Sequence, residues 1–337
     1  MRRRWVWLGL LATLLLAGGG VGAWVYLQIR PLSRAFQPQL VRLKEPMDAD
    51  ALAQRLHQRQ LIRNPRLLAW WLRWKGKPTI AAGDYEFSPN QNLLEIADIL
   101  INERFTRNWV TIPEGWTVAR IAERLHERGI ADKEAFLALC REPQRFQDID
   151  MPLPKDLHLE GYLFPSTYRL PPGTGAEQAI RTMLQTTRQQ VYLPYKEAMA
   201  QRGLGLHEVL TIAAMIEKEV LHDDERPRVA SVIYNRLRLG MPLQIDATVL
   251  YGMGYWKDRV LHKDLRHNSP YNTYLRRGLP PGPIANPGVA SVRAALYPEQ
   301  TDYLFYVAQP NGYHRFSRTY AEHLQAIREI RQSQRGR

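Results

Sequence analysis

The feature that most constrains this chain is a run of 23 residues, 5–27, that contains no charged side chain. At a rise of about 1.5 Å per residue, a helix of this length crosses the ~30 Å hydrocarbon core of a membrane. It also exceeds the roughly 7–15 apolar residues of a secretion signal. Arginines at positions 2–4 precede the run and Arg30 follows it, which favours a cytoplasmic amino terminus. We expect an uncleaved anchor, with cleavage near the small residues 17–20 as the alternative.

The placement that this anchor implies limits the partners of the rest of the chain. No later stretch is long and apolar enough to cross again, so the remainder is expected in the periplasm of a bacterium whose inner membrane holds the anchor. The net charge of +13 then favours attraction to anionic lipid or an anionic polymer, and nucleic acid is not expected as a partner. The single cysteine, Cys140, excludes an internal disulfide framework and a cysteine-built zinc finger.

Residues 31–106 alternate short strands with capped helices, which predicts a small α+β module. The expected elements are strands at 40–43 and 83–87, and helices after Asp48 or Asp50, after Asn64-Pro65, and after Asn92. In layout, the module resembles the LysM-type glycan-binding modules.

A weak internal echo links this module to the start of the next segment. Seven identities recur at an offset of 69 residues, from Val41 and Val110 to Arg59 and Arg128. With a strand at 109–112 and Thr117 as a helix cap, we interpret the echo as a repeated strand–helix–helix unit. Chance similarity between two amphipathic helices is the alternative.

A buried helix with two carboxylates near its end is the strongest chemical signal. Its apolar residues share one helical face: Val209, Ile212, Ala213, Ile216 and Val220. Glu217 and Glu219 are about 200° apart around the helix axis, so they flank opposite sides of that face. A desolvated carboxylate is costly unless it is paired or protonated. Geometry alone does not choose between the two glutamates, and two solvated charges at a helix end remain the plain alternative.

The segments that follow combine amides, hydroxyls and aromatic rings between proline turns, which is the mixture that sugars require. Motifs of other chemistries are missing from the sequence. His207 is followed four residues later by Thr211 rather than a second histidine, and there is no glycine-rich phosphate loop. The acidic run 222–225 is interpreted as a helix start before Arg226-Pro227. No metal or cofactor is therefore predicted.

Seven motifs together resemble the endolytic murein transglycosylase (YceG-like) family, in order and in spacing across residues 107–330. They are 160–165, 216–219, 229–237, the Gln244/Asp246/Thr248 segment, 269–274, 278–288 and 312–317. One departure is Ser166, where the family pattern leads us to expect an acidic residue. The resemblance implies three parts: a cytoplasmic stub and anchor at 1–30, the LysM-like module at 31–106, and a mixed α+β catalytic domain at 107–337.

The resemblance also implies an activity and its residues. Family members cleave the MurNAc–GlcNAc bond within peptidoglycan strands and leave 1,6-anhydro-MurNAc ends. The family's catalytic glutamate matches Glu219, expected to be partly desolvated with a raised pKa, and Glu217 becomes structural or supporting. A strand is expected at 303–308, with a hairpin turn after it that leads back to His314, and His314 either reaches the site or caps its sheet. The candidate substrate-binding residues, each with a loop-stabilising hydrogen bond as the alternative, are Asn235, Gln244, Asp246, Thr248, Asn272 and Tyr274.

Peptidoglycan synthases are the partners that the family implies, because an enzyme tethered by one helix works where new strands are made. Two other functions remain open at this point. One is a conventional two-carboxylate wall hydrolase with Asp246 as base or nucleophile. The other is a tethered glycan-binding scaffold without turnover.

Overall fold

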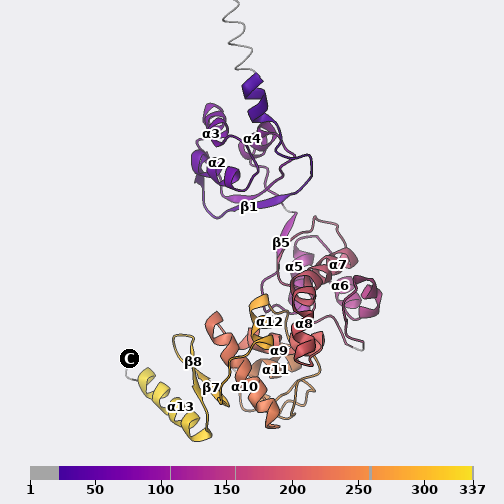
Figure 1. Ribbon diagram of the computed structural model, residues 1–337, viewed down its shortest axis with the longest axis vertical. Coiled ribbons are helices and arrows are strands. Elements are labelled where there is room, and N and C mark those ends of the chain that lie inside the picture. Colours follow the sequence, from indigo (N-terminus) through magenta and orange to yellow (C-terminus); the bar gives the residue numbers. More distant parts are fainter. Residues whose placement is uncertain (1–22, 107, 156, 258–259, 336–337) are drawn as a thin grey trace, which may run out of the picture. The chain divides into compact units, whose positions relative to one another are not determined.

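The computed structural model describes residues 23–106, 108–155, 157–257 and 260–335, and the chain divides into two units, Met1–Trp109 and Val110–Arg337 (Figure 1). The expected anchor at 5–27 lies largely in residues 1–22, outside the described residues. Residues 23–29, which include the described end of this run, are helical. Among the helices that the structure describes, none is long and apolar enough to span a membrane.

The first unit is built on two short antiparallel strand pairs. Strand β1 (Gln39–Leu43) pairs with β4 (Gly83–Phe87), with Val41 opposite Tyr85, and β2 (Met47–Asp48) pairs with β3 (Thr79–Ile80). Alternation along β1 and β4 buries Val41, Leu43, Tyr85 and Phe87 on one face.

Three helices cover the buried face of these strands, each begins at a side-chain cap, and all three lie where the sequence predicts a helix. They are α2 (Ala49–Gln58) with Asp48, α3 (Pro65–Trp74) with Asn64, and α4 (Leu93–Ile101) with Asn92. Asn92 and Glu95 form a capping box, so two unpaired amide groups of the first turn are satisfied. Their apolar faces close one core.

The second unit starts like the first, with a strand and two helices. Strand β5 (Trp109–Thr111) pairs with β6 (Thr167–Arg169), and Thr117 caps α5 (Val118–Glu127). Val110 and Leu125 are buried, as are Val41 and Leu56 at the echoed positions. The repeated layout is thus present. Next come α6 (Lys133–Leu139), the 3₁₀ helix η1 (Pro143–Ile149), α7 (Ala176–Thr187), the π-helix η2 (Arg188–Tyr192) and α8 (Leu193–Gln201).

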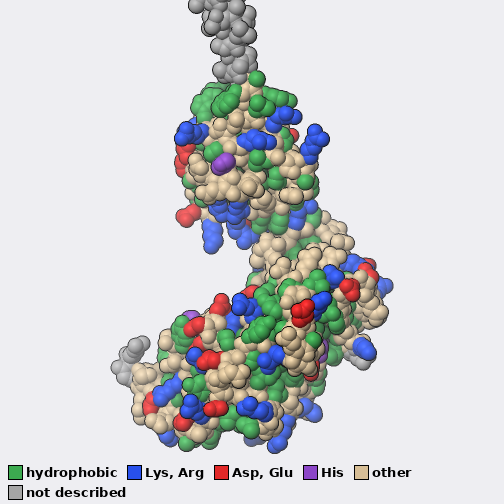
Figure 2. All heavy atoms as spheres, viewed as in Figure 1, with side chains coloured by type: hydrophobic (Ala, Val, Ile, Leu, Met, Phe, Trp, Pro, Cys, Tyr) green, Lys and Arg blue, Asp and Glu red, His purple; other side chains and the backbone are tan. Residues whose placement is uncertain are grey.

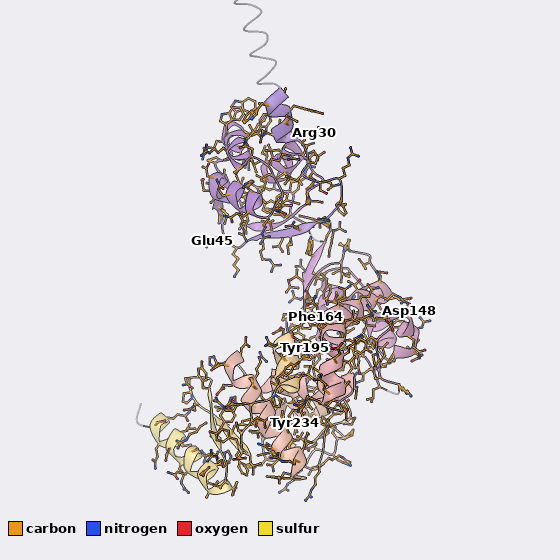
Figure 3. All side chains as sticks on the ribbon, viewed as in Figure 1. Arg30, Glu45, Asp148, Phe164, Tyr195 and Tyr234 are labelled. Carbon is orange, nitrogen blue, oxygen red and sulfur yellow. The ribbon has the colours of Figure 1, made fainter. Side chains whose placement is uncertain are left out.

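Helix α9 (Leu206–Glu219) is the central helix of this unit, and it is buried all round rather than on one face. Every residue from Val209 to Ile216 is buried, because α8, α10 (Arg226–Arg238), α11 (Asp246–Met253) and α12 (Val289–Leu296) pack around it. Tyr234 of α10, labelled in Figure 3, donates a 2.7 Å hydrogen bond to the carbonyl of Ala295 and so fastens α10 to α12. Surrounding helices therefore fix the position of the last turn of α9.

A hairpin and a final helix complete the unit. The expected strand at 303–308 is observed as β7 (Phe305–Ala308), and it pairs with β8 (His314–Ser317) so that Ala308 lies opposite His314. Helix α13 (Tyr320–Arg335) packs on both strands. The acidic run before Arg226-Pro227 is a helix start, as predicted, and forms η3 (Asp223–Glu225). The remaining short element is η4 (Asp264–Arg266).

Candidate active site

The last turn of α9 sends three consecutive charged side chains in three directions. Glu217 faces the start of α12, and Glu219 faces β7. The Lys218 ammonium lies 4.2 Å from the centroid of the Trp256 ring. The two carboxylates therefore enter different environments, as the 200° separation predicts.

Glu217 has the contacts of a structural residue. Its Oε2 accepts hydrogen bonds from the amide of Gly288 at 3.0 Å and from the hydroxyl of Ser291 at 2.8 Å, and its Oε1 lies 3.3 Å from Arg226 Nη1. The side chain is only 6% exposed. A carboxylate at this place satisfies a free amide group at the start of α12 and interacts favourably with the positive end of that helix dipole. Glu217 thus joins α9, α10 and α12.

Glu219 is half-buried and its Oε2 accepts a 3.0 Å hydrogen bond from the hydroxyl of Tyr306 on β7. Burial raises the pKa of Glu219 to about 7. The Tyr306 hydrogen bond opposes this rise and the negative charge of Asp246 adds to it. A carboxyl group with such a pKa exchanges a proton at neutral pH, as a general acid must.

Asp246 and Tyr274 form a second carboxylate–phenol pair beside the first. Asp246 opens α11, is exposed, and accepts a 2.6 Å hydrogen bond from the Tyr274 hydroxyl. Burial raises the pKa of Tyr306, and burial together with the Asp246 bond raises that of Tyr274, so both phenols stay protonated and donate. The structure thus brings Glu219, Asp246 and Tyr274 of the predicted set together, with Tyr306 added.

Arg236 holds in place the segments that carry Tyr306 and Asp246. Its guanidinium donates to the carbonyls of Leu304 and Leu243, each at 2.7 Å, and lies 3.4 Å from the side-chain oxygen of Gln244. These bonds tie α10 to the residue that precedes β7 and to the segment before α11. Gln244 is exposed, with a left-handed backbone (φ 54°), and so lies at the edge of the group.

His314 does not contact Glu219, because the side chain of Tyr306 lies between them. Its Nδ1 is 3.0 Å from Oε2 of the buried Glu225, and its ring meets the ring of Tyr306 edge-on, with centroids 5.2 Å apart. Glu225 also accepts from the backbone amide of His314 at 2.9 Å. His314 therefore supports Tyr306 rather than bonding to the catalytic candidate directly.

Asn235, Thr248 and Asn272, the other three predicted substrate-binding residues, instead form hydrogen bonds that stabilise loops, as the alternative interpretation expects. Asn235 donates to the carbonyls of Thr301 and Tyr303, Thr248 donates to the carbonyl of Ile245, and Asn272 donates to those of Leu265 and His267. Thr248 and Asn272 have no exposed surface. The structure does not bring these side chains to Glu219, although Asn235 lines a separate hollow of about 450 Å³ with Arg202 and Arg238.

Sequence reasoning missed Tyr306, Arg236 and Glu225. Tyr306 lies in a strand that the sequence indicated, yet its partner is 87 residues away. The signal for Arg236 was a charged side chain between apolar positions of a packed helix. For Glu225 it was one carboxylate in a run interpreted only as a helix start. Within the described residues, no cluster of three or more His, Cys, Asp or Glu side chains is arranged to hold a metal ion.

Comparisons with known proteins give a consistent result. The model of the YceG-like family matches residues 41–329. The chain is 35% identical over 299 residues to the endolytic murein transglycosylase of Bacillus subtilis, covering 85% of this chain and 83% of that protein. It is 27% identical to the enzyme of the same description from Streptococcus pneumoniae, of which it spans only 54%. The crystal structure of a YceG-like protein from Listeria monocytogenes aligns over 87% of this chain and all of that one, with a TM-score of 0.61 and 32% identity.

Proposed function

Because the chain belongs to the YceG-like family, we propose that it is an endolytic murein transglycosylase acting on the MurNAc–GlcNAc bonds within peptidoglycan strands. Its product ends are 1,6-anhydro-MurNAc. The observation that carries the mechanism is the environment of Glu219, a carboxyl with a pKa of about 7 that Tyr306 holds by a hydrogen bond.

In the proposed reaction, one carboxyl group serves twice. Glu219 starts protonated and gives its proton to the glycosidic oxygen while the bond from that oxygen to C1 breaks. The 6-hydroxyl of the same MurNAc then attacks C1, and the Glu219 carboxylate takes its proton. No water is consumed, and the glutamate returns to its starting state.

The neighbours of Glu219 have separate roles in this scheme. Tyr306 orients the carboxyl group, and Arg236 and His314 hold the strand that carries Tyr306. The negative charge of Asp246, with Tyr274 bound to it, stabilises the positive charge that develops at C1 in the transition state.

The experiment that tests the function uses purified full-length protein in detergent and uncrosslinked glycan strands, with products identified by mass. We expect anhydro ends from the wild type, loss of at least about 100-fold in rate for Glu219→Gln, and unchanged activity for Glu197→Gln, an exposed glutamate on α8. An active Glu219→Gln enzyme would remove Glu219 from the mechanism.

A second candidate function is favoured by the closeness of Asp246. If Asp246 served as base or nucleophile, the two carboxylates would form the pair of a conventional glycoside hydrolase. The same masses separate the two reactions, because hydrolysis yields hydrated reducing ends. The scaffold alternative is disfavoured because the curated relatives are enzymes.

The proposed location is the inner membrane, with residues 5–27 as a single anchor, a cytoplasmic amino terminus and a periplasmic catalytic domain. Protease added to intact spheroplasts should then digest the second unit and spare a tag at the amino terminus.

We further propose that peptidoglycan synthases are partners, so crosslinking in cells should recover a synthase. Failure with every synthase would contradict the partnership.

A further inference from the structure

Helix α3 presents three tryptophans on one side, and two of them are largely exposed. Trp70 and Trp74 are 55% and 62% exposed, and Trp71, between them, packs partly against the core of the first unit. Leu67, one turn before Trp71, is also partly buried against that core. We propose that this face of α3, which we term the tryptophan face (Trp70, Trp71 and Trp74), seats the first unit on the surface of an anionic lipid bilayer.

The ring geometry favours lipid over sugar as the occupant. Trp70 and Trp74 stack on each other with centroids 6.2 Å apart and an interplanar angle of 6°. The ammonium of Lys75 lies over the Trp74 ring, 4.6 Å from its centroid. A sugar ring needs an open aromatic face, and these faces are partly covered. Indoles at a membrane interface lie at the level of the headgroups, with an apolar body and a polar N–H group, and do not require an open ring face for stacking.

The charge around the tryptophan face complements anionic headgroups. Residues 51–83 contain seven lysines and arginines and not one aspartate or glutamate. Arg73 and Lys77 are paired with Asp50 and Glu103. Arg66 and Lys75, among the residues that the structure describes, form no ion pair. A short amphipathic helix with tryptophans and basic residues is the usual form of an interfacial element.

The segment that leaves the expected anchor is attached to the same part of the unit. The Arg63 guanidinium, just before α3, donates a 3.1 Å hydrogen bond to the carbonyl of Pro31, and Ile29 packs on the core that Trp71 covers. Figure 1 shows helix 23–29 and α3 toward one end of the first unit, and Figure 2 shows hydrophobic side chains gathered there. Arg30 and Glu45 lie toward opposite ends in Figure 3. The inference uses the proposed anchor only to bring this end to the bilayer.

The test uses full-length protein in vesicles of phosphatidylcholine and phosphatidylglycerol, with and without brominated lipid as a quencher of tryptophan emission. The emission of Trp70 and Trp74 is the difference between wild type and Trp70→Phe/Trp74→Phe, and we expect bromolipid to quench it about twofold or more. The matched control is Trp256→Phe, a 38% exposed tryptophan of the second unit, whose difference emission should stay unquenched. Arg66→Gln/Lys75→Gln should lower the equilibrium constant between the quenched and the unquenched state of these tryptophans about fivefold for each charge removed.

Three results would overturn the seating, and circular dichroism checks that each variant is folded. If the protein floats with the vesicles but Trp70 and Trp74 remain unquenched, the anchor stands and the seating is wrong. If glycan oligosaccharides in the absence of lipid change the emission of Trp70 and Trp74, the tryptophan face is a sugar site instead. Protein that does not float at all contradicts both the anchor and the seating.

Discussion

At the scale of single residues, the proposed chemistry depends on how burial and two neighbouring residues set the proton affinity of Glu219. Burial and the charge of Asp246 raise the pKa, and the Tyr306 hydroxyl lowers it. The balance at about 7 keeps a useful fraction of the group protonated at neutral pH while leaving its conjugate base strong enough to take a proton back.

This balance predicts the pH profile and how two variants shift it. Because the acid must start protonated, kcat/KM should be full below pH 7 and fall as the pH rises through about 7. Tyr306→Phe removes a donor to the carboxylate, so the falling limb should move up by about one pH unit, with a rate loss of about tenfold. Asp246→Asn removes a negative charge, so the limb should move down. Kinetics on soluble glycan fragments from pH 5 to 9 measure both.

The control for these shifts is Tyr297→Phe, an exposed tyrosine in the second unit. The falling limb of kcat/KM against pH for this variant should coincide with that of the wild type. Limbs that move in the same direction for Tyr306→Phe and Asp246→Asn would show that the profile belongs to another group.

At the scale of elements, the sequence predicted what local chemistry decides. The caps Asp48, Asn92 and Thr117 begin helices as expected, because a side chain that bonds to the amide groups of the first turn acts over three residues. It predicted neither the burial of α9 on all sides nor the bond from Tyr306 to Glu219. Both depend on which distant segments pack together, and the periodicity of one helix does not contain that information.

The two glutamates of α9 should respond oppositely to the same substitution. Glu217→Gln removes the charge that pairs with the buried Arg226, so the free energy of unfolding should fall by about 2–4 kcal/mol. Glu219→Gln removes a group whose folded pKa of about 7 lies above its ordinary value of 4.5. The wild type loses stability relative to this variant as the pH rises from about 4.5 to 7, so the variant should be more stable by up to about 3 kcal/mol at pH 8 and equal near pH 4. Urea unfolding at both pH values measures these differences, and a stabilising Glu217→Gln would contradict its structural role.

In the motif at 160–165, the backbone conformation and the close packing at Gly161 require a glycine. Its φ of +84° disfavours any side chain, and a Cβ there would lie 2.3 Å from the Cβ of Pro283. Gly161→Ala should therefore cost about 2–4 kcal/mol of unfolding free energy. Gly173→Ala is the matched control, because its φ is +80° with open space around it, and it should cost only about 1 kcal/mol. Equal costs in thermal unfolding would show that the contact with Pro283 is not what requires glycine.

At the scale of the whole molecule, the chain consists of two units with separate cores, and the second alone holds the Glu219 group. The basic excess falls partly on the first unit, where residues 51–83 carry no acidic side chain. Under the proposed anchor, the first unit directly follows the membrane segment along the chain, and the second unit holds the proposed catalytic group.

The central claim is that the substrate's own 6-hydroxyl, and not water, attacks C1 while Glu219 handles both protons. The most direct measurement is to run the reaction of the wild-type enzyme in H₂¹⁸O and to determine the masses of the new MurNAc ends. The account predicts 1,6-anhydro ends without ¹⁸O. New ends that carry ¹⁸O from the first turnover would contradict it and assign the water-activating role to Asp246.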